Sequence, residues 1–424
     1  MRRLFYTEDS IQNKISYFHL LVFLALLPFD RFFSTIALIS FLVHSIINFR
    51  LSLIRLVNRD VFFLQSVFWV TVLASIYAIS FSAAMNSVSK QLAILLFPLI
   101  LSTTELDLVK YRSRLMMAFA ITCTLTVCYL YFDAFRVMQY DDMPFSSLFS
   151  AAFVNHNFSL PIGMHATYLS AMLAISFIYL LKRILLGSRK NNRILQTVAL
   201  VILLAGLIQL SSKSVLIALV MIINIGFPWH ISNPQKKLRF MVTALVASLL
   251  VFTVIYSVDI YRTRYVSDFR NDLFKSTAGA KENWRRERWK VSFELIRRAP
   301  IAGQGSGSEI PLLKQKYFEK KMFSSYLNEL NAHNQYLSFL INSGIIGLLV
   351  FLATLGWGYR KAIKRNDLLL LSFLVIITAI GFSEDLLDVN KGIFFYAFFF
   401  PFFIFSKKKV ENSTSENQQA TVAT

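Results

Sequence analysis

Cysteine, acidic residues and charge as a whole are scarce in this chain of 424 residues. The two cysteines, Cys123 and Cys128, lie in one apolar run, which excludes a disulfide framework and a cysteine-rich metal site. Charged residues make up 16% of the sequence, against about 25% in soluble domains. The 55% of hydrophobic residues and the mean hydropathy of +0.54 exclude disordered, collagen-like and small secreted proteins and indicate a membrane protein.

The shortage of acidic residues leaves a strong positive charge. Lys and Arg number 44 and Asp and Glu number 24, so the formal net charge is +20. In a soluble protein this excess would indicate nucleic-acid binding. In an apolar chain, basic residues more often gather in the cytoplasmic loops between membrane spans. The positions of the charges therefore decide what the excess means.

Twelve apolar runs are candidates for membrane-spanning helices, which need about 20 mostly apolar residues. Eight are clear, and four are short or poorly separated, so a re-entrant hairpin remains an alternative for an adjacent pair. The runs cover residues 16–29, 32–49, 61–84, 91–102, 115–135, 166–181, 195–210, 215–229, 240–257, 335–357, 368–382 and 392–405. We expect an all-α polytopic membrane protein with about twelve transmembrane helices, whose phenylalanines face the lipid.

The basic residues between the runs alternate from one side to the other. Twenty-four of them fall in alternate segments that include both termini, whereas the short loops on the other side hold five. This is the positive-inside pattern. It predicts that both termini are cytoplasmic.

The other 15 basic residues fall in one long outer loop, residues 258–332, which has a net charge of +6. Structureless loops of this length are uncommon unless they are functional or disordered. Residues 282–298 have a helical pattern that places Arg285, Arg288 and Trp289 on one face. The expected organisation is therefore nine spans over 1–257, a partly helical periplasmic loop over 258–334, three spans over 335–406 and a disordered cytoplasmic tail over 407–424.

A histidine motif follows the loop. His333 and Asn334 are followed by nine residues, Gly344, two residues and Gly347. At these positions the sequence resembles the O-antigen ligase family, whose hallmark has this spacing. The Gly-rich stretch 300–307 and Arg285, four residues before Trp289, are similar to further family elements.

The resemblance also covers the turn Ser212-Lys213-Ser214, which occupies the place of the family's Ser-Arg element. Lys213 keeps the charge there, but it lacks the bidentate fork of an arginine. The motifs extend from about residue 195 to residue 349, and the first six spans share only the architecture.

The resemblance implies a GT-C-like fold that transfers a glycan at the periplasmic face of the bacterial inner membrane. The donor is a glycan on undecaprenyl pyrophosphate, and the acceptor is a lipid A-core hydroxyl. The family is taken to use no cofactor, metal or nucleotide sugar. Membrane lipids are the other expected partners, and nucleic acid is excluded.

The residues suit this chemistry. His333 can take the proton from the acceptor hydroxyl as a general base, helped by a position at a helix N-terminus. Lys213 and Arg285, with Arg288 on the same helical face, can stabilise the pyrophosphate leaving group. A surface position is the alternative for Arg288. Asn334, Gly344 and Gly347 have supporting roles, with the glycines packing helices closely.

Three alternatives remain at this point. A polymerase of lipid-linked repeat units and a protein O-oligosaccharyltransferase share the donor and the base, and differ only in the acceptor. A transporter is a more remote alternative. It predicts ionisable residues in mid-span and two similar halves, and the sequence shows neither. The sequence leaves open the oligomeric state and the roles of His156, His165, Glu384 and Asp385.

Overall fold

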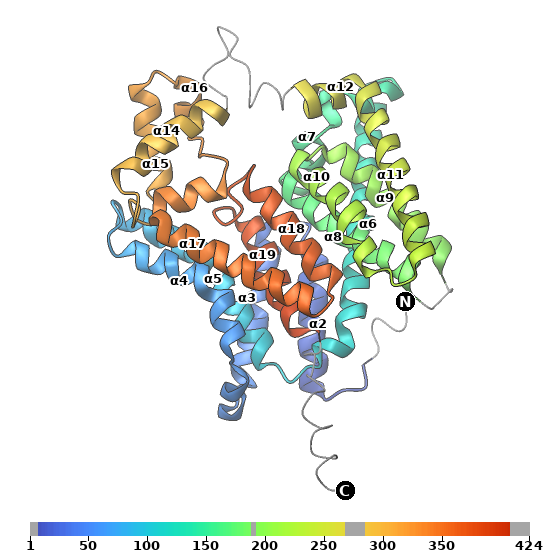
Figure 1. The fold of residues 1–424 in the computed structure, drawn as a ribbon, viewed down its shortest axis with the longest axis horizontal. Helices are drawn as coiled ribbons and strands as arrows, with labels where there is room; N and C mark the ends of the chain where they lie inside the picture. The colour runs from blue at the N-terminus through green and yellow to red at the C-terminus, as the bar shows by residue number, and fades with distance from the viewer. Residues whose placement is uncertain (1–6, 188–191, 268–284, 408–424) are drawn as a thin grey trace, which may run out of the picture.

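The computed structural model of the protein describes residues 7–187, 192–267 and 285–407, and within these ranges it is helical and contains no strand (Figure 1). The first half contains α2 (Ile11–Leu26), α3 (Arg31–Ile47), α4 (Arg59–Ser75), α5 (Phe81–Thr103), α6 (Leu108–Tyr140), α7 (His156–Ser159), α8 (Ala166–Leu186) and α9 (Arg193–Leu210). The second half contains α10 (Lys213–Met221), α11 (Pro234–Ser257), α12 (Asp259–Arg262), α14 (Arg285–Arg298), α15 (Glu309–Glu319), α16 (Phe323–Leu327), α17 (Gln335–Lys364), α18 (Leu368–Gly381) and α19 (Asn390–Phe405).

Short 3-10 and π-helical turns join several of these helices. The 3-10 turns are Leu51–Leu56, Phe145–Phe149, Ala151–Phe153, Leu160–Ile162 and Pro228–His230, and the π-helical turns are Ile222–Gly226 and Thr263–Ser267. Polar side chains cap many helix starts. Asp107, for example, accepts a hydrogen bond from the backbone N–H of Lys110 at the start of α6.

Seven helices among the described residues are long and apolar enough to cross a membrane. They are Phe81–Thr103, Leu108–Tyr140, Ala166–Leu186, Arg193–Leu210, Lys213–His230, Pro234–Ser257 and Gln335–Lys364. The shorter apolar helices are Ile11–Leu26, Arg31–Ile47, Leu368–Gly381 and Asn390–Phe405. The protein is thus an all-helical, multi-pass membrane protein, as expected, while the count of twelve spans stays a prediction.

The predicted span 61–84 is wrong in its boundaries. Helix α4 ends at Ser75, and α5 begins at Phe81, where the Ser80 hydroxyl accepts a hydrogen bond from the Ala83 N–H at 3.3 Å. The apolar run passes straight through this turn, so hydropathy alone hides it. As a result Lys90, expected in an outer turn, lies inside α5.

The phenylalanines do not all face lipid, contrary to expectation. Helix α19 is buried along its whole length from Lys391 to Ile404, at the centre of the helix bundle with α8 and α18 (Figure 1). Its rings pack against one another and against Phe373 of α18, with centroids 5.6 Å apart for the tilted pair Phe373–Phe395. The outermost apolar surface comes instead from helices such as α11, in which only Ala244 and Ile255 are buried.

Ion pairs join the segments that the charge pattern predicts to be cytoplasmic. Arg112 and Asp367 pair at 2.7 Å, and Lys361 and Asp60 pair at 2.9 Å. The helices of the long loop, α14, α15 and α16, lie together at the top of Figure 1, above α4, α5 and α17. One end of the bundle thus carries these ion pairs, and the other carries the helices of the long loop. The side of the membrane that each end faces stays a prediction.

The helix predicted over residues 282–298 is confirmed for the described part, as α14. Residues 282–284 lie outside the described residues. Beyond the loop, α17 is broken at Gly344, whose φ of 62° and ψ of −162° are not helical.

Candidate active site

Arg285 and His333, two residues singled out in the sequence, meet at Glu384. His333 Nδ1 lies 3.1 Å from Glu384 Oε2, and an Arg285 guanidinium nitrogen lies 3.7 Å from Glu384 Oε1. Arg285 begins α14, His333 precedes α17, and Glu384 belongs to the connection between α18 and α19. Three separate parts of the chain thus build one partly exposed polar site.

The backbone at His333 has an uncommon conformation. Its φ is +47°, a left-handed value, and its N–H donates to Asn331 Oδ1 at 3.1 Å. We expected His333 to open a helix, but it lies one residue before the N-cap. Asn334 is the cap of α17, and its Oδ1 accepts from the N–H groups of Tyr336 and Leu337 at 3.0 and 3.1 Å.

Glu384 is the acceptor that orients the His333 ring. Burial alone would raise the pKa of Glu384, but the hydrogen bond to His333 and the charges of the surrounding histidines and Arg285 hold this pKa below its usual value. An ionised carboxylate only accepts hydrogen bonds, so the proton of a neutral His333 is on Nδ1. Nε2 has no hydrogen-bond partner among the described residues and is left with its lone pair.

His156 and His165 also belong to this end of the bundle. Their ring centroids are 4.1 Å apart, and both feel the charges of Glu384 and His333. Burial lowers the pKa of His165 to about 4, although Glu384 opposes this shift. His165 is therefore neutral at neutral pH, and its Nδ1 accepts from the Thr167 N–H at the start of α8.

Lys213 is the first residue of α10 and is half-buried. Its neighbour Ser214 accepts a hydrogen bond from the Ser383 hydroxyl at 2.9 Å, and Ser383 precedes Glu384. The start of α10 is thus fixed to the turn that carries Glu384. Lys213 therefore lies at the same end of the bundle as Arg285 and His333.

Arg288 is buried, with 5% of its surface exposed, so the alternative of a surface position is wrong. It lies near Tyr317 of α15, where its charge opposes the rise that burial causes in the pKa of Tyr317. Arg288 packs inside the small core of the long loop. Its predicted contact with pyrophosphate stays a prediction.

The Gly-rich stretch 300–307 fills the break in α17. The N–H groups of Gln304 and Gly305 donate to the carbonyls of Ile341 and Asn342 at 2.7 and 2.9 Å, and the Ile345 N–H donates to the Pro300 carbonyl at 2.9 Å. These bonds satisfy backbone groups that a broken helix leaves open. The stretch is therefore a strap that fixes α17 to the loop.

Gly344 and Gly347 are glycines for different structural reasons. A Cβ at Gly344 would collide with the backbone of Ile301, and its positive φ also disfavours a side chain. A Cβ at Gly347 would meet Ser343 of the same helix and Val70 of α4, at 3.2 Å from Val70 Cγ1. Packing, as expected, accounts for Gly347, whereas Gly344 is required by the helix break.

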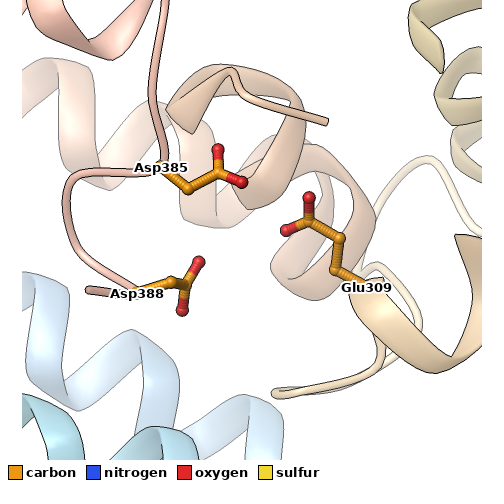
Figure 2. Close-up of side chains that lie close together, drawn as sticks. All are labelled: Glu309, Asp385 and Asp388. Atoms are coloured by element: carbon orange, nitrogen blue, oxygen red, sulfur yellow. The ribbon is translucent and has the colours of Figure 1, made fainter. Parts of the chain in front are cut away.

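Three carboxyl groups lie beside the histidine, two of them buried (Glu309 and Asp385) and one half-buried (Asp388). Glu309, Asp385 and Asp388 each offer an oxygen within 4.8 Å of the others, as Figure 2 shows. Burial raises the pKa of Glu309 to about 7 and also raises the pKa values of Asp385 and Asp388. The sequence predicted no metal ligands, yet this is the group of described residues that could hold a metal ion.

Sequence reasoning missed Glu309 and left Glu384 and Asp385 undecided. The sequence did contain one signal for this acidic site. Three acidic residues, Glu384, Asp385 and Asp388, lie in a single short connection of a chain that has few acidic residues. No comparable signal marked Glu309, because an acidic residue in the first turn of a helix, here α15, is common.

Comparison with known proteins agrees with the motif. Residues 198–352 match the family model described as O-antigen ligase, a segment that contains Lys213, Arg285 and His333. A search of the curated proteins finds no match. Members of the matched family are glycosyltransferase-like ligases and polymerases. The O-antigen ligase match of this membrane protein is thus a match of residues 198–352, the part of the chain that also carries the motif.

Proposed function

We propose that the protein transfers a glycan from undecaprenyl pyrophosphate to a lipid A-core hydroxyl, with His333 as the general base. The observation that carries this proposal is the contact of His333 and Arg285 with one carboxylate, Glu384. It puts a base with an available Nε2 next to a cation. Glycan transfer from a pyrophosphate needs both groups.

The reaction is a single displacement. The acceptor oxygen bonds to the anomeric carbon while the bond from that carbon to the phosphate oxygen breaks, which inverts the anomeric configuration. The acceptor proton passes to His333 Nε2, and the electron pair of the broken bond leaves with undecaprenyl pyrophosphate. Glu384 accepts from Nδ1–H and stabilises the imidazolium that forms.

Lys213 and Arg285 stabilise the leaving group. The departing pyrophosphate gains negative charge at a partly buried site, where its attraction to a cation is stronger than in bulk water. Arg285 comes from the long loop, and Lys213 from the start of α10. Both cations lie at one end of the bundle. In this proposal the pyrophosphate of the donor binds at that end, and its lipid tail lies along the apolar helices. Lys213 and Arg285 supply the positive charge that balances the leaving pyrophosphate, so the proposed mechanism uses no metal.

The site faces the periplasm of a bacterial inner membrane in this proposal, with both termini in the cytoplasm. The alternation of basic residues along the chain supports this orientation.

A gel of extracted lipopolysaccharide tests the function and separates the acceptors. Loss of a ligase leaves the lipid A-core uncapped while long lipid-linked polymer persists. Loss of a polymerase leaves cores that carry a single repeat unit, and this outcome would contradict the ligase assignment. Unchanged lipopolysaccharide together with an unglycosylated protein would favour a protein acceptor.

The base assignment is tested with purified protein, lipid-linked donor and lipid A-core acceptor. His333→Ala is expected to abolish transfer while donor binding persists. His230→Ala is the matched control, because His230 is another half-buried histidine but lies near Asp367, at the opposite end of the bundle. Equal transfer by the two variants would overturn the assignment.

A further inference from the structure

The N–H groups of three successive residues around His333 are each held by a side-chain oxygen. Ala332 donates to Glu309 Oε1 at 3.0 Å, His333 donates to Asn331 Oδ1 at 3.1 Å, and Asn334 donates to Asp385 Oδ1 at 2.9 Å. We infer that Glu309 and Asp385 are positioning residues that hold the His333 backbone in its reactive conformation. This inference rests on the proposed role of His333 as the base.

The two carboxyl groups come from buried surroundings. Glu309 begins α15 and is 4% exposed, and Asp385 lies in the connection between α18 and α19 and is 1% exposed. Figure 2 shows that the two carboxyl groups point toward one another from opposite sides. The His333 segment is therefore held from the loop and from the bundle at the same time.

The indole of Trp289 completes this arrangement. Its Nε1–H donates to the Ala332 carbonyl at 3.0 Å, so both the N–H and the C=O of Ala332 are held by side chains. Ala332 itself is fully buried. Trp289 and Glu309 thus fix the two peptide groups on either side of Ala332, the residue before His333.

A backbone clamp is needed here because the conformation is costly. A left-handed φ in a non-glycine residue costs about 1–2 kcal/mol and persists only where the surroundings hold it. Asp385 and Glu384 are adjacent, so one turn holds both the Asn334 backbone and the His333 ring. Relaxation of the clamp would move the imidazole away from Glu384.

A hydrogen bond from an amide needs an acceptor oxygen but no charge. Glutamine at 309 or asparagine at 385 keeps that oxygen, whereas alanine removes it. A metal site in the same cluster would need the carboxylates themselves, and it would also need Asp388. Asp388 Oδ2 accepts from the Ser338 hydroxyl at 3.0 Å and is not bonded to residues 331–334, so Asp388→Asn is a matched control.

The test measures transfer by the full-length protein in detergent. Glu309→Ala and Asp385→Ala are expected to lower kcat by about 100-fold, the cost of a small misplacement of a reacting group, with the KM for the donor almost unchanged. Glu309→Gln, Asp385→Asn and the control Asp388→Asn are expected to stay within about threefold of the parent protein. Trp289→Phe keeps the ring but removes the N–H, and it should lower kcat by about tenfold; it also serves as the test if an alanine variant fails to fold.

A second readout does not depend on activity. The rate at which diethyl pyrocarbonate modifies His333, followed by mass spectrometry of its peptide, is expected to rise severalfold in Glu309→Ala and to stay unchanged in Asp388→Asn. Wild-type kcat and labelling in Glu309→Ala and Asp385→Ala would overturn the clamp, even if His333→Ala is inactive. If His333→Ala is active, the base assignment fails, but the labelling still reports on the clamp.

One outcome would replace the clamp by a metal site. In that case the Gln and Asn variants, including Asp388→Asn, would be as inactive as the alanine variants, and a chelator would inactivate the parent protein.

Discussion

His333 and Glu384 are 51 residues apart in the sequence and meet through a contact of 3.1 Å between Nδ1 and Oε2. The carboxylate fixes which ring nitrogen carries the proton, and it leaves Nε2 to act on a substrate. The same carboxylate is 3.7 Å from Arg285, so it couples the proposed base to the proposed leaving-group cation. Glu384 is the residue through which the site is assembled.

Removal of this carboxylate should impair the base. We expect Glu384→Ala to lower kcat for glycan transfer by about 10²–10⁴-fold, because the ring loses both its orientation and the charge that stabilises the imidazolium. Glu384→Gln keeps an acceptor oxygen without the charge and should retain more activity than the alanine variant. Initial rates with purified protein and lipid-linked donor measure both effects.

Glu329→Ala provides the control for Glu384, because Glu329 is exposed and pairs with Lys314 at the surface. It should keep full activity. If Glu384→Ala were as active as this control, the orienting role of Glu384 would be excluded.

Most of the fold could be predicted from local properties of the sequence. Helical character, the apolar segments and α14 follow from hydropathy and periodicity, which act over a few turns. The boundary between α4 and α5 was missed because an apolar run continues through the turn at Ser80. The buried phenylalanines of α19 were also missed, because in lipid an apolar residue is equally suited to the protein core and to the membrane.

The site was predictable only in part. His333, Arg285 and Lys213 were found because the family motif marks them by spacing, and the structure brings all three to one end of the bundle. Glu384 and Glu309 depend on contacts between distant segments, which spacing does not encode. Gly344 was assigned to helix packing because a break inside an apolar helix leaves no mark on hydropathy.

The two cations should respond differently to conservative changes. Arg285→Ala and Lys213→Ala are expected to lower kcat by about 10²–10³-fold, since each removes a charge that acts on the leaving group. Lys213→Arg should be tolerated within a few fold, because it keeps the charge and adds a bidentate fork. Single-turnover rates with saturating donor separate this loss from weaker binding.

Arg262→Ala is the control for these variants. Arg262 is an exposed arginine at the end of α12 that pairs with Asp259, and its loss should leave the rate unchanged. Full activity of Lys213→Ala would remove Lys213 from the proposed site without affecting the assignment of Arg285.

Gly344→Ala should destabilise the protein. The methyl group would meet the backbone of Ile301 at a residue whose φ is +62°, and such strain costs about 1–3 kcal/mol before any displacement of the strap. Gly356→Ala, in the same helix, has no atom within 4 Å of the added Cβ and should be neutral or slightly stabilising. Thermal unfolding in detergent compares the two, and equal melting temperatures would show that the break in α17 does not require glycine.

The stability of the end of the bundle that carries His333 should depend on pH through His165. Its pKa is lowered to about 4 by burial, whereas an unfolded histidine has a pKa near 6.5. Between these values the unfolded state binds a proton that the folded state does not, so stability falls as the pH falls from 6.5 to 4, by about 3 kcal/mol at most. The raised pKa of Glu309 has the opposite effect on stability. Its carboxyl group holds a proton more tightly in the folded state than in the unfolded state, so the folded protein becomes less stable as the pH rises.

The contribution of His165 is therefore measured as a difference between two proteins. His165→Asn keeps a side chain that can accept from the Thr167 N–H but does not titrate in this range. We expect the melting temperature of the parent protein to fall further than that of His165→Asn between pH 6.5 and pH 4.5. His230→Asn, at the other end of the bundle, serves as the histidine control. Parallel pH dependence of the parent and His165→Asn would mean that His165 gains its proton in the folded state as easily as in the unfolded chain, and burial could then not be what keeps it neutral beside Glu384.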